Sequence, residues 1–337
     1  MRKRRKNDNG RRERNDICSA FRLFGPFMSS NPAPDFWMQC GKTIRRFAPG
    51  ATRDRTSLPW LLLALLLVPA DTRAEPIETE HLFGFTIGSD VGDVGDREIE
   101  GSVTGRFSKR TGTYDAGSGT MSAEFVPLPN LRTEFSGMVN GYEISGVGGY
   151  ADRHETAFGG LSVDIRYRLL DRASAPFGFA IGAEPHWNWL DDLTGERVSQ
   201  YGADFVAAAD WEIIRDRIVA AVNLIYQPDT TRFKLTGIWS REAIAGVAAA
   251  LMAQLRPGVF VGGEARYLRQ YDGFGFESLA GEGFFIGPTV YFKLSDQAWL
   301  TIAWSAQVAG HAAAIAGSPD LVDFERQQVR LLFGVNF

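Results

Sequence analysis

The four histidines of this chain are the side chains best suited to acid–base chemistry or metal binding, because imidazole titrates near neutral pH. They are His81, His154, His186 and His311. No H-x-x-x-H or H-E-x-x-H spacing joins them, so the sequence predicts no metal site and no cofactor. We expect His154 and His311 to lie in loops. We expect His186 to form a hydrogen bond with the nearby Glu184 rather than a catalytic dyad.

Other patterns that carry chemistry are weak or missing. No G-x-S-x-G nucleophile elbow occurs in the sequence. The glycines of "GVGG" (146–149) and "GFGF" (273–276) lack the strand-to-helix context of a phosphate-binding loop. Asp191, Asp192 and Glu196 could attract a divalent cation weakly, but a solvated acidic loop is the expected state. The sequence therefore predicts no catalytic residue.

Most charged side chains instead alternate with apolar ones. In "LSVDIRYRL" (161–169) apolar residues stand at every second position, and "FFIGPTVYFKL" (284–294) has the same period. Since the side chains of a β-strand point alternately to opposite faces, each segment predicts a strand with one apolar and one polar face. Twelve such segments occur, at about 97–108, 113–126, 131–144, 157–170, 176–190, 198–213, 218–231, 237–254, 258–271, 281–294, 297–309 and 323–337.

The connections between these segments alternate in length. The tight turns are 127–130, 171–175, 214–217, 255–258 and 294–297, and the longer loops are 145–156, 191–197, 272–280 and 310–322. An even number of long strands, with short turns on one side and long loops on the other, is typical of a membrane barrel. The sequence thus predicts an all-β fold: a transmembrane antiparallel up-and-down β-barrel of twelve strands, with short periplasmic turns and longer extracellular loops. A soluble β-sandwich is the alternative.

The first 74 residues have a different character from the rest of the chain. Residues 1–74 carry a formal charge of +9, and residues 75–337 carry −13. We interpret 1–57 as a basic polar leader, either an over-long start or a disordered extension. Residues 58–74 contain the apolar run "LPWLLLALLLVPA" and predict a secretory signal that is cleaved after Ala74.

Removal of this part leaves a chain without cysteine. Both cysteines, Cys18 and Cys40, precede the predicted cleavage point, so the mature chain has no disulfide framework. Its negative charge argues against nucleic acid as a partner. Residues 75–96 could be a periplasmic strap, an insert in the lumen or an additional strand, and residues 97–337 are the predicted barrel.

The last strand ends on a bare aromatic residue. In "QQVRLLFGVNF" (327–337), Phe333, Val335 and Phe337 share the apolar face. This ending resembles the C-terminal assembly signal of Gram-negative outer-membrane barrels. The resemblance implies insertion by the outer-membrane barrel assembly machinery, contact with outer-membrane lipid, and location in the cell outer membrane after export through the periplasm.

The resemblance extends over the mature chain. It is carried by "LFGFTIGSD" (82–90), "EIEG" (98–101), "DIRYRLLD" with "PFG" (164–178), "FFIGPT" (284–289) and "FERQQVRLLFGVNF" (324–337). Residues 82–337 resemble an uncharacterised family, a domain of unknown function, of proteobacterial outer-membrane β-barrel proteins. The resemblance implies the barrel fold and no particular activity.

By alternation, the polar faces of the strands should line the lumen with charges of both signs. The charged residues predicted to line it are Glu98, Glu100, Arg106, Glu124, Arg132, Glu134, Asp164, Arg166, Arg168, Glu184, His186, Asp204, Asp210, Glu212, Glu264, Arg266, Lys293 and Arg330. Opposite charges could form ion pairs across the lumen and close it, or they could line a narrow, hydrated channel that selects solutes by charge.

Three functions are compatible with such a barrel. The first is a narrow channel for small polar or charged solutes. The second is a closed structural or adhesive barrel that acts through its loops. The third, a lipid-modifying outer-membrane enzyme, is less favoured, because no serine on the lipid-facing side stands opposite a histidine. We therefore expect a protein that is not an enzyme, and the sequence does not predict its oligomeric state.

Overall fold

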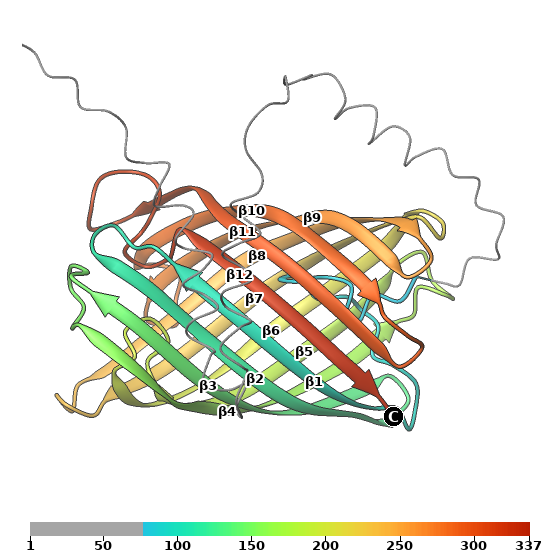
Figure 1. Ribbon diagram of the computed structural model, residues 1–337, viewed down its shortest axis with the longest axis horizontal. Helices are drawn as coiled ribbons and strands as arrows, with labels where there is room; N and C mark the ends of the chain where they lie inside the picture. Colours follow the sequence, from blue (N-terminus) through green and yellow to red (C-terminus); the bar gives the residue numbers. More distant parts are fainter. Residues whose placement is uncertain (1–76) are drawn as a thin grey trace, which may run out of the picture. The chain divides into compact units, whose positions relative to one another are not determined.

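The computed structural model describes residues 77–337, so the leader 1–57 and the signal segment 58–74 lie outside the described residues. Its main feature is a closed antiparallel β-barrel (Figure 1). The strands are β1 (Arg97–Phe107), β2 (Thr113–Leu128), β3 (Leu131–Ser145), β4 (Arg153–Leu170), β5 (Gly178–Leu190), β6 (Arg197–Ile214), β7 (Ile218–Phe233), β8 (Trp239–Arg256), β9 (Val259–Asp272), β10 (Leu279–Lys293), β11 (Ala298–Ala312) and β12 (Gln327–Asn336).

Each strand pairs with its neighbours in sequence, and β1 pairs with β12 to close the sheet. The closing register runs from Glu98 opposite Asn336 to Phe107 opposite Gln327. Closure removes the unpaired strand edges, and a sheet that crosses hydrocarbon requires this because an unpaired peptide group there costs several kcal/mol. The predicted twelve-stranded antiparallel barrel is confirmed.

Several strands are longer than their apolar alternation suggests. His154 pairs with Glu143 at the start of β4, and His311 pairs with Glu282 near the end of β11. The prediction that both histidines lie in loops is therefore wrong. The sheet pairing continues past the lipid-facing stretch, because the backbone can form ladder hydrogen bonds whatever side chain it carries.

The two ends of the barrel differ. The end that we call the short-turn end holds the tight connections 129–130, 215–217, 257–258 and 294–297, and one longer connection, 171–177. The chain terminus lies there too, where the Phe337 N–H donates to the Arg97 carbonyl at 3.0 Å. The opposite, long-loop end includes the longest connection, 313–326.

The outer face of the wall is apolar and the inner face is polar. Leu224 and Phe205 on the outside are 59% and 45% exposed, whereas Asp210 and Thr301 on the inside are 0% exposed. This distribution is inverted relative to a water-soluble protein. It becomes favourable in lipid, where each Å² of apolar surface removed from water contributes about 25 cal/mol.

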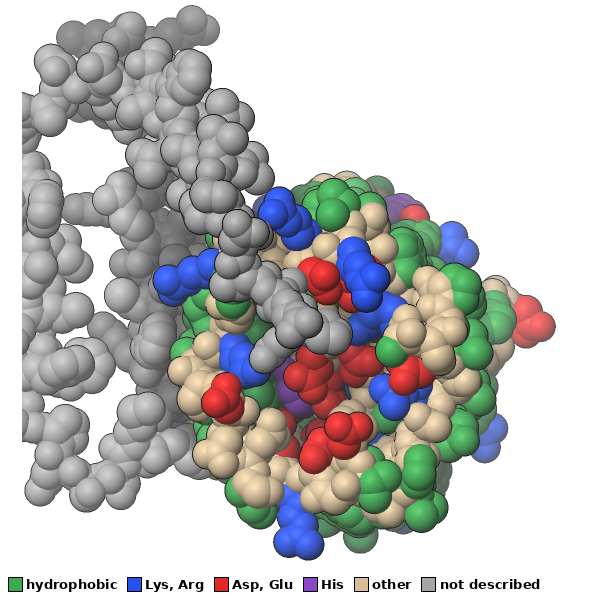
Figure 2. Space-filling model, turned by 90° about the vertical axis from the view of Figure 1, so that its right-hand side faces the viewer, with side chains coloured by type: hydrophobic (Ala, Val, Ile, Leu, Met, Phe, Trp, Pro, Cys, Tyr) green, Lys and Arg blue, Asp and Glu red, His purple; other side chains and the backbone are tan. Residues whose placement is uncertain are grey.

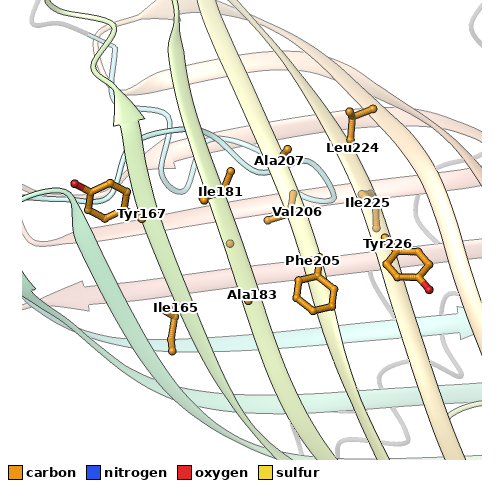
Figure 3. Close-up of a pocket in the computed structure, with 11 residues that line it drawn as sticks. Ile165, Tyr167, Ile181, Ala183, Phe205, Val206, Ala207, Leu224, Ile225 and Tyr226 are labelled. Carbon is orange, nitrogen blue, oxygen red and sulfur yellow. The ribbon is translucent and has the colours of Figure 1, made fainter. Parts of the chain in front are cut away.

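An apolar depression of about 530 Å³ lies on this outer face, across β4 to β7 (Figure 3). Its lining includes Ile165, Ile181, Phe205 and Leu224, which are all exposed residues of the outer face. Because the depression opens toward lipid, it is not part of the polar lumen. Within residues 77–337 the chain forms no helix that is long and apolar enough to cross a membrane.

Residues 77–96, which we call the plug, form no strand. Of the three alternatives for this segment, the additional strand is therefore wrong. Its backbone hydrogen-bonds to buried side chains of β7 and β9, so it lies inside the barrel, at the short-turn end (Figure 1). The segment does not join the sheet because its glycines and aspartates favour turns, and because β1 and β12 already close the barrel.

Candidate functional site

The candidate site is the lumen with the plug inside it, and Glu264 of β9 is the main anchor of the plug. The backbone N–H groups of Gly84, Phe85 and Thr86 donate to its two carboxylate oxygens at 2.7, 2.8 and 2.6 Å. Glu264 is 4% exposed, so these are charge-assisted bonds in a place with little water. A Cβ at position 84 would overlap Ala303, and the turn therefore requires glycine there.

Two further side chains of the inner face, on β6 and β7, bind the plug. Asn223 of β7 accepts from the Ile87 N–H at 2.7 Å and donates to the Ile87 carbonyl at 2.8 Å. Asp210 of β6 accepts from the Ser89 N–H at 2.6 Å and from the Thr79 hydroxyl at 2.7 Å. Both side chains are almost fully buried, so the plug replaces the water that would otherwise solvate them.

The longer connection 171–177 supplies an arginine to the plug. Arg172 donates to the Ile77 carbonyl, forms an ion pair with Asp90 at 2.8 Å, and contacts Asp210. Burial alone would lower the pKa of Arg172, but the charges of Asp90 and Asp210 raise it above its ordinary value. The connection is long because it holds this clamp over the mouth of the barrel.

Apolar contacts fix the first arm of the plug. Ile77, Leu82 and Phe83 form one buried cluster with Val219, Ala221, Ala250, Met252 and Phe260 of the wall. Leu82 is 1% exposed. Burying a side chain of this size contributes about 1.5–3 kcal/mol.

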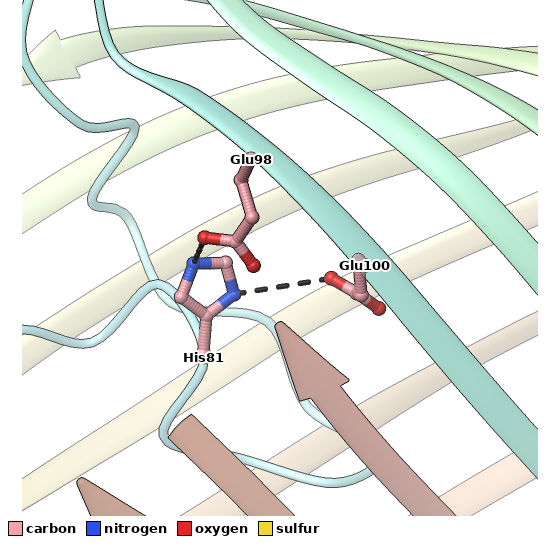
Figure 4. Close-up of side chains that lie close together, drawn as sticks. All are labelled: His81, Glu98 and Glu100. Carbon is pink, nitrogen blue, oxygen red and sulfur yellow. Dashed lines mark ion pairs between the residues drawn. The ribbon is translucent and has the colours of Figure 1, made fainter. Parts of the chain in front are cut away.

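His81 lies against Trp299 of β11 and beside Glu98 and Glu100 of β1, and we call these three wall residues the wall pocket. Figure 4 shows the imidazole between the two carboxylates. The imidazole stacks on the Trp299 ring with 4.1 Å between centroids and 10° between planes. Its Nε2 lies 3.3 Å from Glu98 Oε2, and its Nδ1 lies 3.9 Å from Glu100 Oε2. Trp299 Nε1 in turn donates to Glu98 Oε1 at 2.8 Å.

Gly334 of β12 makes this wall pocket possible. It stands between the other two strands, opposite Glu100 on one side and Trp299 on the other. A Cβ at Gly334 would overlap both Glu98 Oε1 and Trp299 Nε1. Its missing side chain lets the indole and the carboxylate meet across the strand.

The ligand atoms of His81, Glu98 and Glu100 lie close enough together to share a metal ion. Both imidazole nitrogens, however, face carboxylates, since Nε2 also lies 3.7 Å from Glu80 of the plug, and such surroundings favour an imidazolium. Burial alone would lower the pKa of His81, but the hydrogen bond to Glu98 and the charges of Glu80, Glu98 and Glu124 raise it to about 9. The histidine is therefore a cation at neutral pH.

Carboxylate side chains of successive strands lie next to one another on the inner face of the barrel wall. In the sheet register Glu98 stands opposite Glu124, Glu124 opposite Glu134, and Glu134 opposite Asp164. Asp164 and Glu184 lie between the paired positions Ser162↔His186 and Ile165↔Ala183 of β4 and β5. Glu184 stands opposite Asp204. The acidic ladder is our name for these residues: Glu98, Glu124, Glu134, Asp164, Glu184 and Asp204.

The acidic ladder runs from the short-turn end of the barrel toward its middle. Glu98 lies near the start of β1 at the short-turn end, where acidic side chains gather in the centre of the mouth (Figure 2), and Asp204 lies well inside β6. Like charges directly opposite each other destabilise a sheet. Stability of the wall therefore does not account for the ladder.

The lower rungs are partly neutralised. Arg132 forms ion pairs with Glu124 at 3.0 Å and with Glu134, and it also reaches Glu80 of the plug at 3.4 Å. Arg166 pairs with Asp164 at 2.8 Å. Among residues 77–337, Glu184 has no ion pair within 4.0 Å. Asp204 has an ion pair with His186 at 4.0 Å and a hydrogen bond from Gln227 at 2.8 Å.

The structure places the other charged residues predicted for the lumen in three groups. Three contact the plug: Arg168 lies 3.7 Å from Asp90, Arg330 donates to the Gly84 carbonyl at 3.0 Å, and Arg266 covers the Phe85 ring at 4.0 Å. Glu212 accepts from the Asp216 N–H at 2.8 Å at the short-turn end, where Lys293 is exposed at the end of β10. Arg106 faces the long-loop end.

His186 has a different partner from the one predicted. Its Nε2 lies 2.8 Å from Asp229 of β7, and not beside Glu184 of its own strand. The expected pair does not form because the missing side chain of Gly202 lets the imidazole reach Asp229 instead. His186 and Asp229 meet across Gly202 of β6, where a Cβ would overlap the carboxylate.

The long-loop half is narrowed by connections of the wall itself. Arg106 pairs with Asp192 of the connection 191–196, which is thus not a freely solvated acid. Partial desolvation would raise the pKa of Asp192, whose side chain is half exposed, but the charge and the hydrogen bonds of Arg106 lower it. Lys109 donates to the Val322 and Phe324 carbonyls at 3.0 and 2.9 Å, so it holds the connection 313–326.

Comparisons with known proteins agree with this architecture. A family described as a family of unknown function (DUF6662) matches residues 75–337. An outer membrane channel of the COG4313 group from Pseudomonas putida F1 has a similar structure, with a TM-score of 0.50 and 14% identity over 74% of this chain and 98% of that chain. At such identity the likeness shows the shared fold alone. The predicted resemblance to an uncharacterised outer-membrane barrel family is confirmed.

Two further structures share less of the geometry. The NanC porin has a TM-score of 0.42 and 9% identity over 71% of this chain and 98% of its own. The translocator domain of the autotransporter NalP from Neisseria meningitidis has a TM-score of 0.42 and 11% identity over 74% of this chain and 91% of its own. None of the curated proteins compared with the chain matches it.

Proposed function

The chain belongs to the DUF6662 family, and we propose that its barrel is an outer-membrane channel for small polar or charged solutes, closed in this structure by the plug. The observation that carries this proposal is the upper part of the acidic ladder. Glu184 has no ion pair within 4.0 Å among residues 77–337, and it stands opposite Asp204, whose ion pair with His186 is as long as 4.0 Å. A dry closed interior would make these two charges very unfavourable. Water or a passing solute relieves that penalty, so the residues suit a wet channel.

The attachment of the plug supports the same proposal. Side-chain acceptors of the wall, such as Glu264 and Asp210, hold its backbone, and it pairs with no strand. Its withdrawal would therefore break no bond of the sheet. A segment that can leave without unfolding the barrel is suited to gating.

A closed barrel that acts through its loops is the second candidate. It is favoured by the long-loop end, where Lys109 and Gln307 hold the connection 313–326 over the barrel and Asp320 is 0% exposed. If this connection seals the lumen, the exposed loops remain as the working surface.

Single-channel recording in planar bilayers separates the two functions. We expect rare, small unitary steps for the mature wild-type protein and frequent, larger steps for Glu264→Ala, because the plug loses its main anchor. Glu242→Ala is the matched control, since this inward carboxylate hydrogen-bonds to Gln270 at 3.1 Å, far from the plug. Silence of all three proteins at high protein load would reject the channel and favour the closed barrel.

The proposed location is the cell outer membrane, reached through the periplasm, with the short-turn end on the periplasmic side. The apolar outer face suits outer-membrane lipid as its surroundings, and the ending at Phe333, Val335 and Phe337 suits the barrel assembly machinery as a partner. We propose no enzymatic role. The pair of His186 and Asp229 is on the lumen side, whereas a lipid-modifying site would face lipid.

A further inference from the structure

We propose that the wall pocket of Trp299, Glu98 and Glu100 is a binding site for the flat cationic group of a solute, and that His81 of the plug fills it as an internal ligand. The inference rests on the proposed channel function, because it names the class of solute: small organic cations that carry a guanidinium or a similar planar charged group.

The occupant of the pocket is the first argument. The imidazole of a separate segment lies flat on the indole at 4.1 Å, with Nε2 3.3 Å from Glu98 and Nδ1 3.9 Å from Glu100. Glu80 of the plug itself lies 3.7 Å from Nε2. A planar cation over an aromatic face gains from stacking and from the attraction of the ring for positive charge. Two carboxylates beside the ring then select a group with donors on two sides, which a guanidinium also has.

The construction of the pocket is the second argument. Gly334 and the hydrogen bond from Trp299 Nε1 hold Glu98 against the indole edge, and all these groups belong to the wall. Glu98 and Trp299 are therefore held together by the wall itself and not by His81. Withdrawal of the plug would leave two carboxylates and an aromatic face without their cation.

The acidic ladder is the third argument, because the pocket contains its first rung. From Glu98 the carboxylates continue through successive strands to Asp204. A cation that displaces His81 thus meets further acids at each neighbouring strand, although Glu124, Glu134 and Asp164 are paired with Arg132 or Arg166. The preference for cations over anions should therefore depend most on Glu184 and Asp204, which pair with no arginine among residues 77–337.

Equilibrium titration of the detergent-solubilised mature barrel tests the pocket. The probes are argininamide and its near-isostere citrullinamide, which has the same α-amino group but an uncharged ureido side chain. We expect argininamide to bind the wild type weakly and His81→Ala about tenfold more tightly, as follows if the pocket is vacant in about a tenth of wild-type molecules. The double variant Glu98→Gln, Glu100→Gln should lose this binding, and citrullinamide should bind none of the proteins.

Two results would overturn the inference. Equal binding of citrullinamide would show that charge is not recognised, and weaker binding of argininamide to His81→Ala would show that the histidine belongs to the site. A Zn²⁺ titration tests whether His81, Glu98 and Glu100 are instead a metal site. Tight Zn²⁺ binding that disappears in His81→Ala would make the cluster a metal centre and reject the cation pocket. Circular dichroism melting of each variant verifies that it is folded.

Bilayer recording distinguishes this inference from the channel proposal. In a KCl gradient, the reversal potential of His81→Ala should indicate preference for K⁺ over Cl⁻, and Glu184→Gln with Asp204→Asn should reduce it. Conduction without cation preference and without argininamide binding would reject the present inference and leave the channel intact. Binding without conduction in any variant, Glu264→Ala included, would reject the channel and with it the assignment of a transported solute.

Discussion

The two halves of the lumen are closed by different means. In the short-turn half a separate segment is bound by buried acceptors of the wall, with three backbone donors on Glu264 alone. In the long-loop half the wall's own connections fold inward, and they are held by Arg106 and Lys109. The first arrangement binds a segment that pairs with no strand, so its contacts can be lost while the sheet stays intact. Under the proposed channel function, the short-turn half would act as the gate and the long-loop half would stay fixed.

Removal of the Glu264 carboxylate should have the largest effect on this comparison. Glu264→Ala deletes charge-assisted hydrogen bonds that contribute about 1.5–3 kcal/mol each. A Thr86→Cys reporter in the otherwise cysteine-free mature chain should then react with a thiol reagent at least 100-fold faster, at about tenfold for each 1.4 kcal/mol. The same reporter with Glu242→Ala should stay protected. An unchanged rate in Glu264→Ala would contradict the assignment of the plug as the gate.

Two glycine-to-alanine variants, one in each half of the lumen, test whether the halves act independently. Gly334→Ala forces a Cβ into Glu98 and Trp299, so it should disrupt the His81 pocket and raise the Thr86→Cys rate about tenfold. Gly202→Ala makes the same kind of overlap with His186 and Asp229 and should leave that rate unchanged. If both variants release the plug equally, then the two halves are not independent.

The plug should also respond to alkaline pH. The pKa of His81 is raised to about 9, so its stabilising contribution is complete below about 6.5 and is lost as the pH rises through 9. The groups facing it are Glu80, Glu98, Glu100 and Glu124, all acidic, and the neutral ring of Trp299. The Thr86→Cys rate, normalised to the denatured chain, should rise between pH 7 and pH 10. His81→Gln should remove this rise, and persistence of the rise would assign it to another group.

The smallest effect is expected at the long-loop half. Arg106→Gln removes the ion pair with Asp192, whose side chain is 50% exposed, so the loss should be about 1 kcal/mol or less. Labelling of a Glu196→Cys reporter should rise a few-fold while Thr86→Cys is unaffected. A large rise at Thr86→Cys would mean that the long loops also hold the plug.

The sequence predicted correctly those features that depend only on whether a side chain faces lipid or the lumen. Alternation in 161–169 and 284–294 gave the strands, because lipid on one side and a polar lumen on the other impose a period of two. The sequence predicted less well which side chains contact each other inside the barrel. His186 was matched with Glu184, but the missing side chain of Gly202 allows contact with Asp229 two strands away. No local signal in the sequence marks such a contact.

The plug illustrates the same limit. "LFGFTIGSD" (82–90) begins with apolar residues and ends in Gly and Asp, which left strap, insert and strand all open. Its place depends on Glu264, which follows it by about 180 residues in the chain. The acceptor for three peptide groups could not be recognised before the barrel had brought these residues together.

The sequence by itself determined the barrel, its number of strands and the polarity of its two faces, because these follow from residue period and turn chemistry along the chain. Only the tertiary structure decided that a segment fills one half of the lumen, that carboxylates of successive strands form a ladder, and that His81 lies on Trp299. Those facts depend on strand register and on closure between β1 and β12, which join residues that no short stretch of sequence contains together.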